Sequence, residues 1–161
     1  MVRQVKPVHL RPMALEDIPT IVDWVTTNPL WQRYQLTAEK AHAQFERALE
    51  KNEWLVVADL NQGDCACGFA WCLGDGAFGR SAYLRLIGVR PDCAGSGIGA
   101  SLLAQAEQFA LTISDDLFLL VSDFNMGAQR FYRRHGYDQI GAIPGYVLPD
   151  VAELIYRKHL R

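Results

Sequence analysis

The sequence lacks the features that mark membrane, secreted and nucleic-acid-binding proteins. No apolar run approaches the roughly 18 residues that a membrane-spanning helix needs. No apolar stretch follows Met1–Lys6 in the form of a signal peptide. The net charge is only −2 and the pI is near 6.1, so no positive field draws the chain toward nucleic acid or lipid. We therefore expect a cytoplasmic protein that binds neither.

Cysteine is also scarce, and its spacing does not predict a metal site. Cys65 and Cys67 form one close pair, without a second pair or suitably spaced histidines. A zinc site usually needs two such ligand pairs. On a strand, Cys65 and Cys67 would share one face and Cys72 would lie on the other. The simpler interpretation is that these cysteines and Cys93 are buried or half-buried small residues and that no metal binds.

The rest of the composition is that of an ordinary globular domain. The 161 residues, half of them hydrophobic and 21% charged, fit one domain over residues 1–161. Apolar periodicity predicts helices near 15–27, 37–49, 98–110 and 127–135. It predicts strands near 8–11, 54–58, 67–73, 82–89, 117–121, 137–142 and 151–157, with turns at 61–64 and 74–79.

The continuous apolar run Leu117–Val121 gives the fold class. It comes after a predicted helix and reads as a strand buried on both faces, which is typical of a parallel strand reached by a helical crossover. The earlier strands alternate with turns and favour hairpins. The prediction is an α/β (α+β) fold, with a mostly antiparallel mixed sheet of about six to seven strands flanked by about four helices.

A glycine-rich segment in the middle of the chain is its most informative feature. A predicted strand ends at Arg90-Pro91, glycines alternate at Gly95, Gly97 and Gly99, and a helical pattern follows at once. Glycine lets the backbone approach a ligand closely, and a helix N-terminus offers unpaired N–H groups and a positive dipole end. The segment therefore predicts a phosphate cradle.

Two common phosphate cradles do not match this segment. A P-loop carries Lys followed by Ser or Thr after its last glycine, whereas Ala100-Ser101 stands here. A dinucleotide-binding fingerprint has the spacing Gly-x-Gly-x-x-Gly in the first strand–helix unit. Here the spacing is Gly-x-Gly-x-Gly, and three or four strands precede it. Nucleoside triphosphate and dinucleotide binding are both disfavoured.

A third kind of phosphate-binding loop does match, and the resemblance extends beyond the loop along nearly the whole chain. Val89-x-Pro91 followed by Ala94-Gly95-Ser96-Gly97-Ile98-Gly99-x-x-Leu102-Leu103 resembles the acetyl-CoA loop of the GNAT-type N-acetyltransferase superfamily. Asn125-x-x-Ala128-x-x-Phe131-Tyr132-x-x-x-Gly136-Tyr137 is similar to its second signature. Arg11-Pro12 with Asp17, and Glu153-Leu154-x-Tyr156-x-Lys158, resemble its opening and closing segments.

The resemblance implies acetyl-CoA as the acetyl donor and assigns residues to it. The pyrophosphate would lie on the loop and helix start, which comprise Ala94, Gly95, Ser96, Gly97, Ile98, Gly99 and Ala100. The Ile87 N–H would contact the thioester carbonyl, and Gly88 and Val89 would run beside the pantetheine. Asn125 would be a helix N-cap, a coenzyme contact or both. Tyr132 would protonate the leaving thiolate, although its alternative is core packing beside Phe131.

The chain departs from the resemblance in two places. Ala94 stands where such proteins usually carry Arg or Gln, which predicts weaker coenzyme binding. The strand near 81–86 has no acid to act as general base, so we assign none, and Asp123 is either a fallback base or a turn residue. These departures keep open an alternative: a non-catalytic acyl-CoA-binding sensor or scaffold.

The acceptor is expected to be a primary amine of a small molecule or peptide. Trp31, Tyr34, Arg85 and Tyr146 are the candidate acceptor residues, because aromatic side chains attract amines and Arg85 suits an acidic group. Trp24 is assigned to the core instead. The assembly state is open, and a homodimer is one option.

Overall fold

A computed structural model describes residues 7–61, 63 and 65–161 of the chain. The segment Met1–Lys6 and two residues of the expected turn at 61–64, Gln62 and Asp64, lie outside the described residues. A seven-stranded mixed sheet has the order β1-β2-β3-β4-β5-β7-β6. β4 and β5 pair in parallel, whereas the pairs β1–β2, β2–β3, β5–β7 and β6–β7 are antiparallel. The predicted fold class is confirmed.

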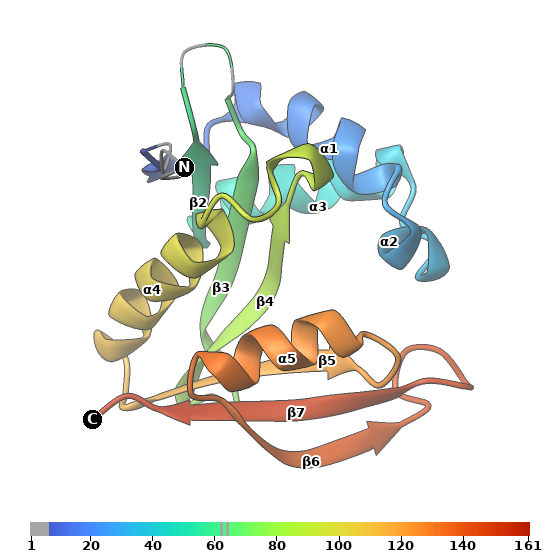
Figure 1. Ribbon diagram of the computed structural model, residues 1–161, viewed down its shortest axis with the longest axis vertical. Coiled ribbons are helices and arrows are strands. Elements are labelled where there is room, and N and C mark those ends of the chain that lie inside the picture. Colours follow the sequence, from blue (N-terminus) through green and yellow to red (C-terminus); the bar gives the residue numbers. More distant parts are fainter. Residues whose placement is uncertain (1–6, 62, 64) are drawn as a thin grey trace, which may run out of the picture. The chain divides into compact units, whose positions relative to one another are not determined.

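The chain divides into two compact units, and β3, β4 and α4 pass from one to the other (Figure 1). The first comprises the described residues up to Cys72 together with Leu86–Ala106, and the second comprises Leu73–Arg85 and Glu107–Arg161. Among the described residues, no helix is long and apolar enough to cross a membrane.

The first unit holds most of the helices. Its complete elements are β1 (His9–Pro12), the 3-10 turn η1 (Leu15–Asp17), α1 (Ile18–Thr26), α2 (Pro29–Arg33), α3 (Ala38–Glu50), β2 (Trp54–Asp59) and η2 (Pro91–Cys93). It also contains the start of β3 (Gly68–Ala77), the end of β4 (Ser81–Val89) and most of α4 (Ile98–Leu111).

Helices cover both faces of the first unit's strands. A Cβ on Gly68 of β3 would contact Ile98 and Leu102 of α4. The next residue, Phe69, points to the other face and packs on Phe45 of α3 with ring centroids 5.3 Å apart. Successive strand residues point to opposite faces, so α4 and α3 lie on opposite sides of β3.

The helix α2 is absent from the sequence-based prediction, which treated Asn28-Pro29 only as a break. Asn28 accepts a hydrogen bond from the Leu30 N–H at 3.0 Å, and Pro29 occupies the first helical position. A proline is tolerated there because that N–H has no intrahelical partner. The Asn-Pro pair therefore ends α1 and also begins another short helix.

The second unit is a sheet covered by one short helix. It contains β5 (Asp116–Ser122), α5 (Met126–Arg134), β6 (Asp138–Pro144) and β7 (Ala152–His159), with the end of β3 and the start of β4. β5 pairs in parallel with β4 over Leu117–Leu119 and antiparallel with β7. Its residues are all buried or half-buried, which confirms the parallel crossover strand.

The predicted turn at 74–79 is wrong, because β3 continues to Ala77. Gly76 lies inside the strand, where a Cβ would come within 2.8 Å of the Cβ atoms of Leu73 and Tyr83. Glycine is there because two chains approach closely, not because the backbone turns. The turn begins at Phe78, whose φ is +60°.

The predicted placement of the cysteines on one strand is also wrong. β3 begins only at Gly68, and Ala66 has φ +51°, so the backbone turns between Cys65 and Cys67. Cys65 is exposed, whereas Cys67, Cys72 and Cys93 are buried.

Candidate functional site

The glycine loop has an open, left-handed backbone. Gly95 and Gly97 have φ +79° and +84°, and a Cβ on either would meet no heavy atom within 4 Å. Internal packing therefore does not require glycine at these positions. The left-handed conformation does favour it, and the missing side chains leave the backbone accessible to a ligand.

The loop leads directly into the N-terminus of α4. The Gly97 carbonyl accepts the Ser101 N–H at 3.0 Å, which makes Gly97 the first residue bonded into the helix. Ile98 is 1% exposed and anchors this end in the core. The N–H groups of the first helical turn have no acceptor within the helix and carry its positive dipole end. This backbone fits an anionic group such as a pyrophosphate.

The turn before the loop is braced by its own backbone. The Ala94 N–H donates to the Pro91 carbonyl at 3.2 Å, and the Ser96 hydroxyl donates to the Cys93 carbonyl. The Ala94 amide is therefore engaged within the turn. The remaining predicted amide donors begin at Gly95.

The end of β4 directs alternate backbone groups toward its two edges. The Arg90 N–H donates to the Cys67 carbonyl at 2.7 Å, and the Gly88 oxygen lies 3.0 Å from a Cβ built on Gly68. Both groups therefore face β3. Because strand N–H groups alternate in direction, those of Ile87 and Val89 face the opposite edge. This orientation suits the backbone contacts expected of both residues.

An aromatic cluster covers the backbone of Gly88. A Cβ there would lie 2.5 Å from Cη2 of Trp31, 2.9 Å from Cε1 of Phe69 and 3.3 Å from Cη2 of Trp24. Trp24 is 7% exposed, which confirms its core assignment, and Trp31 is half-buried. Trp31, one of the four expected acceptor residues, therefore packs on β4. Tyr34 lies at the C-terminal cap of α2.

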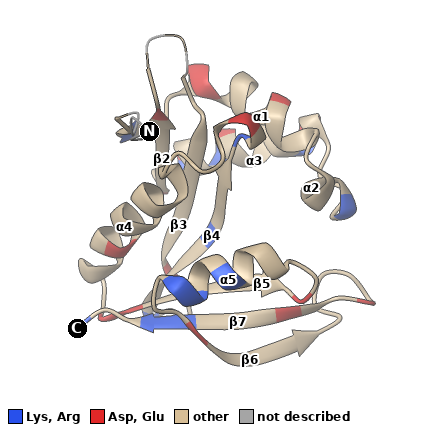
Figure 2. Cartoon of the chain, in the orientation of Figure 1, with Lys and Arg blue, Asp and Glu red and all other residues tan. Residues whose placement is uncertain are grey.

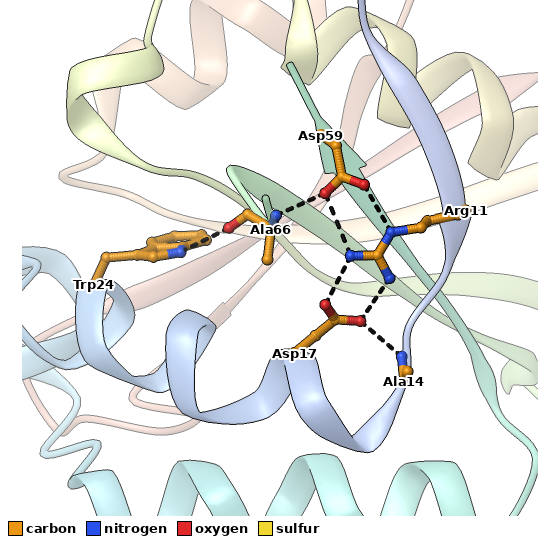
Figure 3. A network of polar contacts seen from close by, with 6 residues as sticks. All are labelled: Arg11, Ala14, Asp17, Trp24, Asp59 and Ala66. Atoms are coloured by element: carbon orange, nitrogen blue, oxygen red, sulfur yellow. Dashed lines mark hydrogen bonds and ion pairs between the residues drawn. The ribbon is translucent and has the colours of Figure 1, made fainter. Parts of the chain in front are cut away.

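A charged network holds α1 and the β2–β3 connection together (Figure 3). The Arg11 guanidinium donates two hydrogen bonds to Asp17, at 2.7 and 2.8 Å, and two to Asp59, at 2.7 and 3.3 Å. Asp59 also accepts the Ala66 N–H at 2.8 Å, and the Trp24 indole donates to the Ala66 carbonyl at 3.0 Å. The family-like opening segment therefore has a structural role, because it holds Trp24 beneath Trp31.

This network also affects the ionisation of Asp17. Burial opposes ionisation of the carboxyl group, but hydrogen bonds from Arg11 and the Ala14 N–H, with the charge of Arg11, outweigh it. The pKa of Asp17 therefore lies below its usual value. The hydrogen bonds to Asp17 and Asp59 raise the pKa of Arg11, so the Arg11–Asp17 pair stays charged near neutral pH.

Two buried thiols, those of Cys67 and Cys93, contact each other just before the glycine loop. Burial raises the pKa of Cys67 to about 11, a hydrogen bond with Cys93 adds to the shift, and the nearby Arg90 opposes it. The Arg90 guanidinium also contacts the Cys93 sulfur at 3.3 Å. Cys67 is therefore protonated at neutral pH and is a packing residue. Among the described residues, no group of three or more His, Cys, Asp or Glu side chains is arranged to hold a metal ion.

In the second unit, Asn125 caps α5 as predicted. Its Oδ1 accepts the Ala128 N–H at 3.2 Å, and Gly136 follows the helix with φ +90°. No hydrogen bond from the Asn125 Nδ2 is recorded within the described part of the chain. The cap therefore uses the amide oxygen and leaves a donor for a ligand.

Tyr132 is part of an aromatic cluster in the second unit. It is 6% exposed, and its ring centroid lies 5.3 Å from Phe131, 5.7 Å from Tyr137 and 6.3 Å from Tyr156. Tyr132 therefore packs in this cluster, and its role in proton transfer stays a prediction. Tyr156 is wholly buried, and its hydroxyl has no hydrogen-bond partner among the described residues.

Tyr83 lies within electrostatic range of Arg85, Glu153 and Tyr146. Burial raises the pKa of Tyr83, the positive charge of Arg85 opposes the shift, and Glu153 and Tyr146 add to it. Glu153 is 5% exposed and pairs across the sheet with Ser122. The sequence does not predict Glu153, a buried carboxylate on β7, as a base, and offers only Asp123 after β5. A charged residue in a strand that must pair on both sides is the signal that points to it.

Asp123 has a structural role at the end of β5. Its carboxylate accepts the Ala152 N–H at 3.0 Å, and its own N–H donates to the Ala152 carbonyl at 2.9 Å. These bonds join the end of β5 to the start of β7. The interpretation as a turn residue is favoured over a catalytic one.

The exposed side of α5 is basic (Figure 2). Arg130, Arg133 and Arg134, with Gly127, line a cavity of about 410 Å³. The helix itself contains no acidic residue. Three guanidinium groups around one cavity favour an anionic ligand over a cationic one.

Comparison with known proteins places these features in a family. The model of the acetyltransferase (GNAT) family matches residues 18–137, which include the glycine loop, Asn125 and Tyr132. The chain belongs to the GNAT family. The resemblance drawn from the glycine loop and the Asn125 segment is thereby confirmed.

Solved structures of other GNAT proteins share the fold. A candidate acetyltransferase of the family from Desulfovibrio desulfuricans superposes with a TM-score of 0.76 at 23% identity, covering 96% of this chain and 100% of that one. Nourseothricin acetyltransferase gives 0.62 at 25% identity, covering 70% and 68%. A candidate acetyltransferase from Salmonella typhimurium, solved with acetyl-CoA, gives 0.72 at 15% identity, covering 96% and 94%. No curated protein sequence matches this GNAT chain.

Proposed function

We propose that this protein transfers an acetyl group from acetyl-CoA to a primary amine of a small molecule or peptide. The observation that carries the proposal is the open loop of Gly95 and Gly97 at the N-terminus of α4, in a member of an acetyltransferase family. Two similar acetyltransferases have been solved with acetyl-CoA, which supports the choice of donor. On this proposal, residues 1–161 act as one functional domain.

The first unit supplies backbone groups in this proposal. The amides from Gly95 to Ala100 receive the pyrophosphate, and Ala94 lies beside it without donating. The Ile87 N–H polarises the thioester carbonyl and stabilises the oxyanion formed when the amine attacks. The backbone of Gly88 and Val89 runs along the pantetheine. These roles need no particular side chain, so the absence of Arg or Gln at position 94 weakens binding without removing it.

The second unit supplies side chains. Asn125 donates from Nδ2 to the coenzyme, and the Tyr132 hydroxyl protonates the leaving thiolate. The amine nitrogen bonds to the carbonyl carbon, the carbon–sulfur bond breaks, and the sulfur gains a proton as the nitrogen loses one. A phenol of pKa near 10 is protonated at neutral pH and can donate to a thiolate whose acid has a pKa of about 8.5. The basic cavity of α5 suits the remaining phosphate charge.

The acceptor must arrive as a neutral amine or lose a proton at the site. An alkyl ammonium has a pKa near 10.4, so a base is needed at neutral pH. Glu153 is a buried acid whose charge acts on Tyr83, and we assign it this role. The acceptor contacts expected from the sequence stay part of the proposal: Arg85 and Tyr146 in the second unit, and Trp31 and Tyr34 in the first.

Release of free coenzyme A tests the proposal. The purified protein is incubated with acetyl-CoA and a panel of amines, amino acids and peptides, and the thiol is measured with a chromogenic reagent. The expected result is amine-dependent thiol release, with the acetylated product identified by mass. Calorimetric binding of acetyl-CoA without thiol release from any amine favours the non-catalytic sensor, for which Ala94 is the favouring observation. Absence of binding contradicts both functions.

A further inference from the structure

The contacts of Gly88 bear on which acyl groups the protein can transfer. Gly88 lies between Ile87 and Val89, the residues to which the proposed function gives the thioester carbonyl and the pantetheine. It presents no side chain on the face that holds α1 and α2. The edge of Trp31 lies where a Gly88 side chain would begin, with Cη2 2.5 Å from the Cβ position. This face of β4 is therefore filled by an indole ring and not by β4 itself.

The ring that fills this space is held on several sides. Trp31 lies 6.2 Å from Trp24 and 6.0 Å from Phe69, centroid to centroid. Trp24 is itself fixed by its hydrogen bond to the Ala66 carbonyl, which the Arg11 network holds. A short helix that begins at the Asn28 cap carries Trp31. An acyl chain that extended toward this face would have to displace a supported indole ring.

We infer that Trp31 sets the length of the acyl group, restricting the donor to short acyl-CoA thioesters such as acetyl and propionyl. This inference rests on the proposed function, because that function supplies the position of the thioester. It gives Trp31 a role in donor selection in addition to the expected acceptor contact. A smaller side chain at position 31 opens apolar space beside Gly88 that a longer chain can enter.

The test compares donors of increasing length in the intact protein. Thiol release is measured for acetyl-, propionyl-, butyryl- and hexanoyl-CoA with one saturating amine, in the natural protein and in Trp31→Leu. A few methylene groups in an apolar pocket change kcat/KM by roughly tenfold or more. We expect Trp31→Leu to raise the hexanoyl-to-acetyl ratio of kcat/KM by at least about tenfold. Trp31→Phe, a milder change, should shift the ratio in the same direction.

Phe45→Leu is the matched control. Phe45 belongs to the same aromatic cluster, at 5.3 Å from Phe69, but it is not among the nearest contacts of Gly88. It should loosen the cluster and leave the donor ratio unchanged. An equal shift in Phe45→Leu means that loosening alone changes the ratio, and the inference fails. An altered KM for the amine with an unaltered donor ratio in Trp31→Leu also overturns it.

A second pair of variants tests the contact itself. Gly88→Ala should lower the melting temperature and the rate with acetyl-CoA, because the new methyl group meets the Trp31 indole and the Phe69 ring, at 2.5 and 2.9 Å from the Cβ position. Combining it with Trp31→Leu should restore both, at least in part. Calorimetry of coenzyme A binding distinguishes failure of the proposed function from failure of the acyl-length inference. A natural protein that binds no coenzyme A contradicts the proposed function, whereas normal binding with an unchanged donor ratio in both Trp31 variants contradicts only the acyl-length inference.

Discussion

In the proposed function, the two units of this protein contribute different kinds of groups. The first presents main-chain N–H groups on a glycine loop, a helix N-terminus and a strand edge, and its side chains hold that backbone in place. The second presents side chains, Asn125 and Tyr132, on a short helix over a sheet. Backbone donors tolerate sequence change so long as the conformation survives, whereas side-chain donors do not. The same substitution therefore tests different properties in the two units.

Arg11→Ala should have the largest effect on stability. It leaves Asp17 and Asp59, whose side chains are only 10% and 16% exposed, without their shared cation. Breaking such a pair costs about 3 kcal/mol of unfolding free energy. Urea unfolding measures the loss, and hydrogen exchange should show it concentrated in α1 and the β2–β3 connection.

Glu107→Gln is the corresponding change in the second unit. The Glu107 carboxylate accepts from the Tyr137 hydroxyl at 3.0 Å and from Lys158 at 2.9 Å. Glutamine retains an acceptor oxygen, so its loss should be smaller, about 1 kcal/mol. Equal losses in the two variants would remove the distinction between a charged network that supports the first unit and a local contact in the second.

Tyr132→Phe tests the side-chain half of the comparison. Loss of a general acid lowers kcat by about 10²-fold, while the retained ring preserves the aromatic cluster. The affinity for acetyl-CoA, measured by calorimetry, should stay within about twofold, because the proposed coenzyme contacts of the backbone are unchanged. An unchanged kcat would return Tyr132 to a packing role alone.

Acid should weaken the Arg11 network. The folded-state pKa of Asp17 lies below its ordinary value of 3.8, so its contribution to stability is fully present above about pH 4. That contribution falls as the pH drops through the lowered pKa. Urea midpoints measured between about pH 7 and pH 2.5 should therefore show a steeper acid loss in the natural protein than in Asp17→Asn. Identical slopes would mean that this carboxylate does not contribute.

Features governed by local chemistry were readable from the sequence. The sequence predicts the Asn125 helix N-cap, because capping depends on neighbours a few residues away. The roles of Gly76 and Gly88 were not readable. Each is glycine because of a side chain from another element, and a single sequence does not show which elements approach each other.

The candidate site shows the same difference between local features, which the sequence predicts, and contacts between distant elements, which it does not. The loop glycines were recognised because a left-handed backbone before a helix is a local property. The position of Trp31 depends on contacts between residues as far as 48 positions apart in the sequence. Trp24 packs on Trp31, and Trp24 is held in turn by Ala66, Asp59 and Arg11. The burial of Glu153 likewise follows from the pairing of β7 with the strands on both sides, which a single sequence does not show.

Gly95→Ala tests the backbone half of the comparison. A left-handed conformation costs a residue with a Cβ roughly 1–2 kcal/mol, and no clash is expected in the open loop. The loop should shift, and the affinity for acetyl-CoA should fall by roughly tenfold. Gly79→Ala is the matched control, since Gly79 also has positive φ, +64°, with open space around it, but lies in the turn between β3 and β4. Loss of affinity in both variants would mean that general destabilisation explains the effect.

Tyr156→Phe should have the smallest effect, and it separates packing from hydrogen bonding within the second unit. The Tyr156 hydroxyl is buried without a partner among the described residues, so removing it relieves a desolvation penalty. Stability should stay the same or rise by up to about 1 kcal/mol. Tyr137→Phe, at a comparably buried tyrosine that donates to Glu107, should lose about that much. Thermal unfolding of the two variants decides the point: destabilisation by Tyr156→Phe would mean that this hydroxyl binds a group in solution, such as an ordered water molecule, and that the second unit holds one more side-chain donor than its own contacts reveal.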